Sequence, residues 1–505
     1  MKENTNKAIA VNSLITYARI FINAVLGLFT TKYTLIALGV SDYGLFSVLG
    51  SFITLVMVVN TIMVSTSNRY LSVAIGKGDE EEMNKVFNVN LTLFGLCAVV
   101  LLMVALPLGL WYTNNYINYD GPIENARMVF VCTIIGSLLS IVAMPFHGLM
   151  MAKERFFVFS ITEVIIHIIR FVVVIILVYN FTNKLLIYSL MQAFTAFLPV
   201  LIYWLYCREK FPDIVKWNIV KNRGQYREML GFSGWVSYGA VAWVARNQGA
   251  SLLVNAFFST AMNAALGIAN TVNSYVTMFA NSLTHPMQPQ ITKSYASGRY
   301  ARTDDLLVMS TKYTFMLMLL VGTPFFVGGE WILGLWLGNV PPYAMSFTVL
   351  LIIDNIVLSF NSGLSPVIFA DGRIALYQVV INTLRLLAIV AAYFVLRSGM
   401  EPQSLFISYI VFSILVVFAT QYCMHKTLHY DMSRVYKESY KPSILTLFLL
   451  SPAFLLPQII HPLFNIVIVE IYLIFLELFV GLNIKERTTL FGVIINKVLN
   501  RNKRE

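Results

Sequence analysis

The sequence predicts an all-α integral membrane protein with about fourteen transmembrane helices, each near the ~20 residues that a bilayer-spanning helix needs. The chain has 505 residues, of which 58% are hydrophobic and only 12% are charged. Its mean hydropathy is +0.72, far above that of a soluble protein of this length. A third observation, an internal repeat, divides the first twelve helices into two pseudo-symmetric six-helix bundles, with two further helices at the C-terminal end.

Hydropathy places the individual helices. We expect them at residues 9–38, 43–68, 85–110, 125–150, 156–180, 185–206, 229–258, 262–289, 306–329, 343–370, 374–397, 402–424, 442–460 and 463–483. The first apolar run is too long and too polar for a signal peptide, so we expect a retained helix.

Lysine and arginine residues are distributed unequally between the loops. Most lie in short loops on one side, whereas the loops around residues 111–124 and 329–342 contain none. Positively charged loops remain cytoplasmic, so both termini are predicted to be cytoplasmic. The formal net charge of +11 is explained by this loop bias, and we expect no nucleic-acid partner.

The internal repeat is clearest in the fifth and eleventh helices. Glu163, His167 and Arg170 have the spacing i, i+4, i+7, which places them on one helical face. Gln378, Asn382 and Arg385 have the same spacing. Both halves begin on the same membrane side, which indicates a parallel repeat with a substrate path between the halves. The predicted parts are residues 1–222, 223–441 and 442–505.

Four arginines lie inside apolar segments and form two matched pairs. Arg19 and Arg246 lie in the first helix of each half, and Arg170 and Arg385 lie in the fifth. An ionised side chain at membrane depth costs roughly 3 kcal/mol or more, so it usually faces a cavity and has a function. We therefore expect a cationic cavity that binds a negatively charged substrate.

Polar residues accompany these arginines on otherwise apolar helices. The expected cavity lining is Thr16, Asn23, Gln248, Asn255, Asn270, Gln378 and Asn382. Packing between helices is an equally good explanation, because small and polar residues also join membrane helices.

Three titratable residues could serve ion coupling. Glu163, His167 and Asp354 are candidates for binding a proton or Na⁺ during transport. The alternative is charge balance, in which Glu163 pairs with Arg170 or His167 and Asp354 pairs with Arg385. Glu470 and Glu477 lie seven residues apart on the last helix without an assigned role. No spacing suggests a metal site. The basic tail, 484–505, is predicted to form an interfacial helix on anionic lipid.

Several runs resemble one known family. They are AVLGLFTT at 24–31, LGVSDYG at 38–44, NAFF at 255–258, NAALGIA at 263–269 and PQITKSY at 289–295. Together they resemble the polysaccharide transporter family of Wzx-type O-antigen and oligosaccharide flippases, over essentially the whole chain. That family belongs to the MOP superfamily, which also holds the MATE drug exporters and the lipid II flippase.

The resemblance implies a function. Such proteins move polyprenyl-diphosphate-linked sugars from the cytoplasmic to the outer leaflet by alternating access, in the biosynthesis of surface polymers such as lipopolysaccharide. It also implies a bacterial inner-membrane location, contact with membrane lipids, and a polysaccharide polymerase or ligase as partner. Arg19 matches the family's basic position in the first helix, and Arg246 matches its second-half counterpart.

Three other functions were weighed. A MATE-like ion-coupled multidrug exporter would favour acids over arginines in its interior. A lipid II flippase would need the same cations, so the sequence does not distinguish this function from the first. A membrane enzyme, such as a polymerase or glycosyltransferase, would need a large external loop or a catalytic acid motif, and the sequence contains neither, so we predict no enzyme activity.

Overall fold

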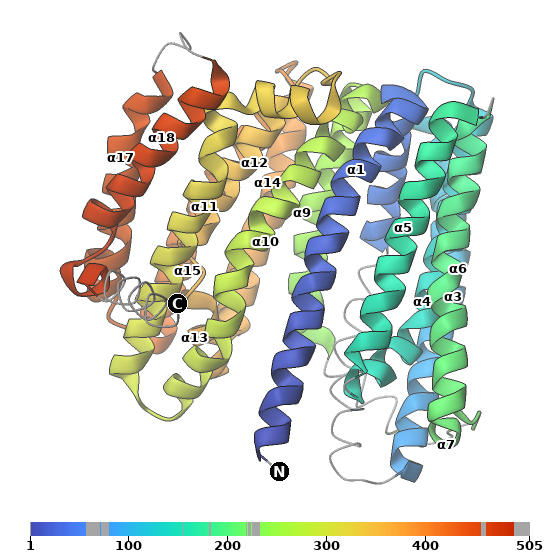
Figure 1. Ribbon diagram of the computed structural model, residues 1–505, viewed down its shortest axis with the longest axis horizontal. Coiled ribbons are helices and arrows are strands. Elements are labelled where there is room, and N and C mark those ends of the chain that lie inside the picture. Colours follow the sequence, from blue (N-terminus) through green and yellow to red (C-terminus); the bar gives the residue numbers. More distant parts are fainter. Residues whose placement is uncertain are drawn as a thin grey trace, which may run out of the picture. The chain divides into compact units, whose positions relative to one another are not determined.

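The computed structural model describes residues 2–56, 71, 80–153, 155–180, 183–218, 220, 224, 233–455 and 461–488. Within these residues the chain is helical and contains no strand, as the sequence predicted. The helices are α1 (Lys2–Val56), α3 (Glu80–Asn115), α4 (Ile123–Ala152), α5 (Phe156–Asn180), α6 (Lys184–Lys210), α7 (Pro212–Val215), α9 (Ser233–Phe257), α10 (Thr260–Ala296), α11 (Tyr300–Leu337), α12 (Ala344–Ser359), α13 (Leu364–Asp371), α14 (Ala375–Arg397), α15 (Ser404–Leu428), α16 (Ser433–Val435), η1 (Tyr436–Tyr440), α17 (Lys441–Leu450), η2 (Ser451–Leu455), α18 (Pro462–Leu476) and η3 (Glu477–Gly481) (Figure 1).

Nine helices of the described chain are long and apolar enough to cross a membrane, or ten if α12 and α13 form one bent span. This confirms a multi-pass membrane protein, while the count of fourteen stays a prediction. The long helices α9 and α10 are not in this set, because both contain many polar residues. The expected helices at 43–68 and 442–460 extend beyond the described residues. Most of the basic tail also lies outside them.

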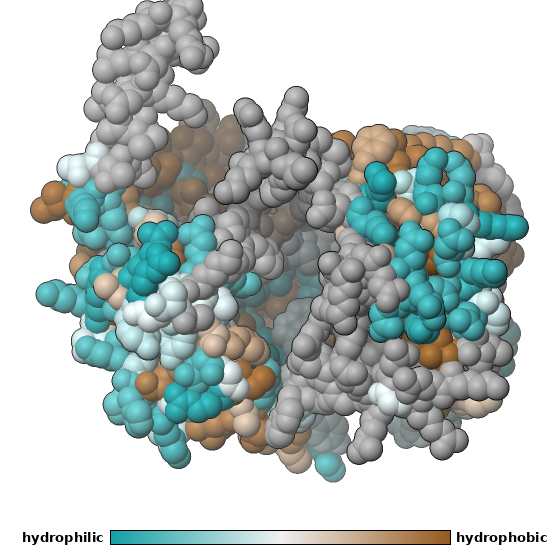
Figure 2. All heavy atoms as spheres, turned by 90° about the horizontal axis from the view of Figure 1, so that it is seen from below, coloured by the Kyte–Doolittle hydropathy of each residue, from teal (hydrophilic) through white to brown (hydrophobic). Residues whose placement is uncertain are grey.

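The surface has the polarity expected of a protein in lipid. Large hydrophobic side chains are exposed along the helices, for example Phe21, Met103 and Phe448. Figure 2 shows the face at which α7 lies, where hydrophilic residues gather at the helix ends. Apolar helix sides and polar helix ends are the arrangement that a bilayer requires.

The chain forms two compact units, Met1–Ile268 and Ala269–Glu505. The first contains α9, because α9 packs against α1. These units are defined by contacts between residues, whereas the predicted parts were defined by the sequence repeat. The division does not test the repeat, so the boundaries at 222 and 441 stay predictions. In the first unit α3, α4, α5 and α6 pack side by side, and α1 packs along α5 (Figure 1). Fully buried Leu45, Phe94 and Phe130 belong to its core.

The range α1 comprises two helices joined by a kink, which agrees with the separate helices expected at 9–38 and 43–68. Its backbone breaks at Gly39, where φ is +80°, a value that favours glycine. Five residues later, a Cβ on Gly44 would lie 1.7 Å from the carbonyl oxygen of Thr260. Only glycine allows this approach of α1 to α10, so the run at 38–44 has a structural role in this fold.

In the second unit, the helix expected at 343–370 is divided. A break at residues 360–363 bends α12 from α13 by 49°. Gly363 lies at this break against α11, and its backbone N–H donates to Thr311 Oγ1 at 3.3 Å. A Cβ there would lie 2.7 Å from the carbonyl oxygen of Leu307.

Candidate functional site: a cationic cluster in the N-terminal unit

The three predicted residues of the fifth helix lie on one unbroken helix. Glu163, His167 and Arg170 belong to α5, so their i, i+4, i+7 spacing places them on one face. All three are half-buried. Because α1 packs along α5, this arrangement brings Arg19 of α1 into the same neighbourhood.

Arg19 is held by an aromatic ring. Its guanidinium carbon lies 4.6 Å from the ring centroid of Phe159, a cation–π geometry. Its Nε is buried and has no hydrogen-bond partner among the described residues. Its charge interacts with those of Glu163 and His167, and with the His147 ring. Arg19 therefore lies beside a carboxylate and keeps an unused donor.

Arg170 lies two turns after Glu163 on the same face of α5. Its Nε donates to Thr195 Oγ1 of α6 at 3.1 Å, and its charge interacts with Glu163. On α6, Thr195 donates in turn to the carbonyl of Gln192 at 3.1 Å. The charges of both guanidinium groups act on the single carboxyl group of Glu163, so the neighbourhood retains an excess of positive charge.

Sequence reasoning missed two residues of this neighbourhood. The His147 ring of α4 lies 4.6 Å from that of Phe159 and 6.2 Å from that of Tyr203 on α6. Both ring nitrogens of His147 and the hydroxyl of Tyr203 are buried without a hydrogen-bond partner in the described structure. An unsatisfied buried polar group costs about 1–3 kcal/mol, so several in one place indicate a ligand or water site.

We call Arg19, His147, Phe159, Glu163, His167, Arg170 and Tyr203 the N-terminal cluster. They come from α1, α4, α5 and α6. Neither His147 nor Tyr203 belongs to a repeated spacing, and the only sequence signal for them is a polar side chain near the end of an apolar run. The combination of unused donors, aromatic rings and excess positive charge suits a ligand with both anionic and hydroxyl groups.

The other predicted residues of this unit have varied environments. Arg246 is buried on α9, at 8% exposure, and Gln248 is half-buried. Asn23 is half-buried, and its Oδ1 has no hydrogen-bond partner among the described residues. The side chain of Thr16 lies outside the described part of the chain.

Asn255 is completely buried, and its side chain forms structural hydrogen bonds. Its Oδ1 accepts from the backbone N–H of Asn118 at 3.1 Å and from the Tyr112 hydroxyl at 3.4 Å. Its Nδ2 donates to the carbonyl oxygen of Asn118 at 3.3 Å. The side chain therefore fixes the loop between α3 and α4, which supports the packing explanation at this position.

In the C-terminal unit, the second predicted face is a hydrogen-bonded chain. Asn382 Nδ2 donates to Gln378 Oε1 at 2.6 Å, and Arg385 Nη1 donates to Asn382 Oδ1 at 3.1 Å. Asp354 is buried and accepts from Ser413 Oγ at 2.5 Å. Asn270 is exposed. Within the described residues, no group of three or more His, Cys, Asp or Glu side chains has the arrangement of a metal site.

Comparison with known proteins identifies the fold. No family model and no curated protein sequence matches the chain. Solved structures do match. An inward-facing multidrug resistance MATE family transporter of the MOP superfamily aligns with a TM-score of 0.67 and 12% identity, over 83% of this chain and 99% of its own. The chain therefore has the fold of the MATE-like membrane transporters.

A second match extends further along the chain. The lipid II flippase MurJ, in an inward closed conformation, aligns with a TM-score of 0.64 and 13% identity, over 93% of this chain and 98% of its own. The eukaryotic MATE transporter AtDTX14 aligns with a TM-score of 0.61 and 15% identity, over 85% of this chain and 98% of its own. These matches confirm the MATE-like fold that the sequence predicted.

Proposed function

We propose that this protein is a flippase that moves a polyprenyl-diphosphate-linked oligosaccharide, the repeat unit of a surface polysaccharide, across a bacterial inner membrane. The observation that carries the proposal is the N-terminal cluster, where the charges of Arg19 and Arg170 both act on the single carboxyl group of Glu163. The transporter fold provides the frame in which such a cluster acts on a substrate.

A diphosphate fits this cluster chemically. Guanidinium groups form paired, charge-assisted hydrogen bonds with phosphate oxygens. The unused Nε of Arg19 supplies a donor, while His147 and Tyr203 offer partners for sugar hydroxyl groups. Outward movement of negative charge against an inside-negative potential releases about 2.3 kcal/mol per charge per 100 mV, which favours export.

Two observations separate this proposal from export of cationic drugs. The cluster has more arginine than acid, and a cation would be repelled by it. In addition, MurJ aligns with 93% of this chain, against 83% for the MATE transporter of highest similarity given above. Lipid II remains the alternative substrate, because it also carries a diphosphate. A polymerase or ligase that receives the sugar outside is part of the same proposal.

The function is tested by reconstitution. Purified protein in liposomes should transfer a fluorescent polyprenyl-diphosphate oligosaccharide between leaflets, measured by access of a membrane-impermeant quencher. The same lipid lacking the sugar, lipid II, and a cationic dye are the comparison substrates. Equal transfer of lipid II would assign the alternative substrate, and transfer of only the dye would overturn the proposal.

Glu163 provides a prediction about coupling. The charges of Arg19 and Arg170 both act on its carboxyl group, and His167 lies one turn away on the same face. A proton bound at Glu163 would remove its attraction for both guanidinium groups and leave their charge to the diphosphate, and loss of the proton would restore that attraction. We expect Glu163→Gln to bind substrate but to lose the response of transport to an imposed pH gradient.

The measurement uses the same liposomes with pH gradient and membrane potential varied separately. Gln378→Leu, which alters the equivalent position of the other helix, is the matched control. If Glu163→Gln responds to pH as the parent does, Glu163 only balances charge, and Asp354 becomes the next coupling candidate.

A further inference from the structure

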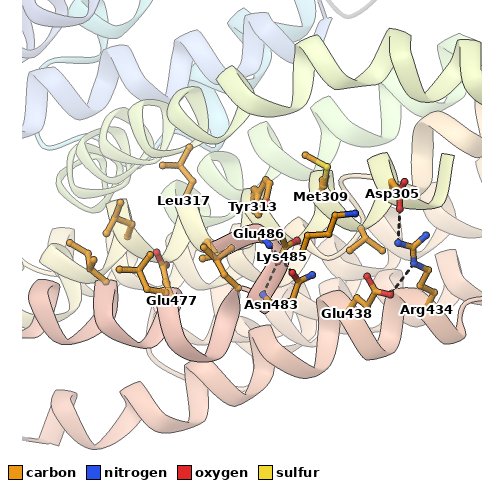
Figure 3. Close-up of a pocket in the computed structure, with 16 residues that line it drawn as sticks. Asp305, Met309, Tyr313, Leu317, Arg434, Glu438, Glu477, Asn483, Lys485 and Glu486 are labelled. Atoms are coloured by element: carbon orange, nitrogen blue, oxygen red, sulfur yellow. Dashed lines mark hydrogen bonds and ion pairs between the residues drawn. The ribbon is translucent and has the colours of Figure 1, made fainter. Parts of the chain in front are cut away.

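The C-terminal unit contains a cavity that the proposed function does not use. Its volume is about 870 Å³, and it lies between α11 and the segment from the end of α18 to Glu486 (Figure 3). Pockets of this size hold small organic ligands. The lining residues used below are Asp305, Leu317, Leu320, Arg434, Glu438, Ile474, Glu477 and Glu486.

Several charged side chains that line the cavity form ion pairs within the protein. Arg434 contacts Asp305 at 2.5 Å and Glu438 at 2.9 Å. Glu486 contacts the ammonium group of Lys312 at 2.6 Å and accepts from the backbone N–H of Asn483 at 2.8 Å. These carboxylates therefore have counter-charges within the protein and make no demand on a ligand.

Glu477 is different. It opens η3, its side chain is only 8% exposed, and its Oε1 is buried without a hydrogen-bond partner among the described residues. Figure 3 shows it at the opposite end of the cavity from Asp305 and Arg434. Ile474 and Leu320 line the cavity as well. A nine-tenths buried carboxyl group in an apolar setting requires a donor, and a cation is the strongest one.

The surroundings of Glu477 select the kind of cation. A divalent metal ion requires about six oxygen ligands, and no group of three candidate ligands occurs in the described residues. A primary ammonium group is neutralised by a single carboxylate, has three N–H donors and can carry an apolar body. We propose that this cavity binds a primary ammonium group attached to a hydrocarbon chain, with the ammonium donating to Glu477 and the chain lying against Leu317, Leu320 and Ile474.

The test compares two probes that differ only in the head group. Dodecylamine is a cation at neutral pH, and 1-dodecanol is a neutral donor of the same length. Native mass spectrometry of the full chain in a neutral detergent should show one bound dodecylamine. Glu477→Gln keeps an acceptor oxygen but removes the negative charge, so we expect dodecylamine to bind about tenfold more weakly or worse. Binding of 1-dodecanol should be weak in both.

Glu330→Gln is the control, because it makes the same change at an exposed position of α11 that does not line the cavity. It should bind dodecylamine like the parent chain. Leu317→Trp, which fills the apolar part and leaves Glu477 unchanged, should also abolish binding. Size-exclusion profiles establish that each variant is folded.

The source of the ammonium group is distinguished by a third probe, dilauroylphosphatidylethanolamine. Glu477-dependent binding of this lipid would identify an aminophospholipid, and binding of dodecylamine alone would identify a free amine. If Glu477→Gln and Leu317→Trp both bind dodecylamine as the parent chain does, the probe only joins the detergent belt and the proposal is wrong. Equal binding of 1-dodecanol would rule out recognition of charge.

Discussion

Replacement of Arg19 or Arg246 by alanine is expected to lower transport about 100-fold or more while the protein stays in the membrane. Each arginine can make two charge-assisted hydrogen bonds to a diphosphate, and each bond contributes roughly 1.5–3 kcal/mol. Their loss together corresponds to at least two orders of magnitude in affinity. The Arg19 guanidinium contacts the Phe159 ring, and its Nε has no hydrogen-bond partner among the described residues. Removal of this side chain should therefore disturb the fold little.

Transport is measured in the liposome assay, and membrane levels are measured by immunoblot. Arg127→Ala is the matched control, because Arg127 is an exposed arginine near the start of α4 whose Nε donates to Asn114 Oδ1 at 2.8 Å. Arg19→Lys should restore only part of the activity, because an ammonium group lacks the planar guanidinium that donates two parallel hydrogen bonds to phosphate. Full transport by Arg19→Ala would remove that residue from the substrate site, and the same holds separately for Arg246→Ala.

The helices were largely predictable because a bilayer imposes their length and polarity. The helix expected at 156–180 is α5, Phe156–Asn180, and that expected at 374–397 is α14, Ala375–Arg397. The repeated i, i+4, i+7 spacing also gave the correct face on α14, where Gln378, Asn382 and Arg385 form a hydrogen-bonded chain. Local periodicity determines such features, so one sequence is enough to find them.

Contacts between helices could not be predicted in this way. His147 and Tyr203 join Arg19 only because α1, α4, α5 and α6 pack together, and no spacing in the sequence records that packing. Asn255 has the same appearance in the sequence as a cavity residue, yet its amide holds a loop. The partner of a polar group in a membrane helix is set by tertiary structure, so the sequence leaves packing and function equally open.

Lys312 is the clearest residue that the sequence reading overlooked. It lies in α11 and is 1% exposed, and its Nζ contacts Glu486 Oε2 at 2.6 Å, across 174 residues of sequence. Glu486 also accepts from the Asn483 N–H at 2.8 Å, while Asn483 Oδ1 accepts from the Glu486 N–H at 2.8 Å, a reciprocal cap at the start of the next helical turn. The Lys312–Glu486 ion pair therefore connects the segment after η3 to the buried part of α11.

We expect this ion pair to be the most sensitive one for stability among the described residues. Removal of one partner of a buried pair costs about 3–5 kcal/mol, because the remaining charge stays buried without compensation. Glu486→Ala should cost more than Lys312→Met, since Lys312 is 1% exposed whereas Glu486 is 16% exposed and can reach water. The double change Lys312→Met with Glu486→Leu should recover much of the loss, because neither charge then remains.

The measurement is thermal unfolding of the purified protein in detergent, followed by intrinsic fluorescence. Lys85→Met is the control, because Lys85 and Glu81 form an exposed pair at 2.7 Å with side chains 38% and 79% exposed. Such a pair contributes roughly 0.3–0.5 kcal/mol, so its loss should leave the midpoint almost unchanged. Equal midpoints for Glu486→Ala and Lys85→Met would mean that Lys312 is reached by water or finds another partner. A double variant less stable than either single one would show that the packing of the two side chains, and not their charges, holds this segment in place.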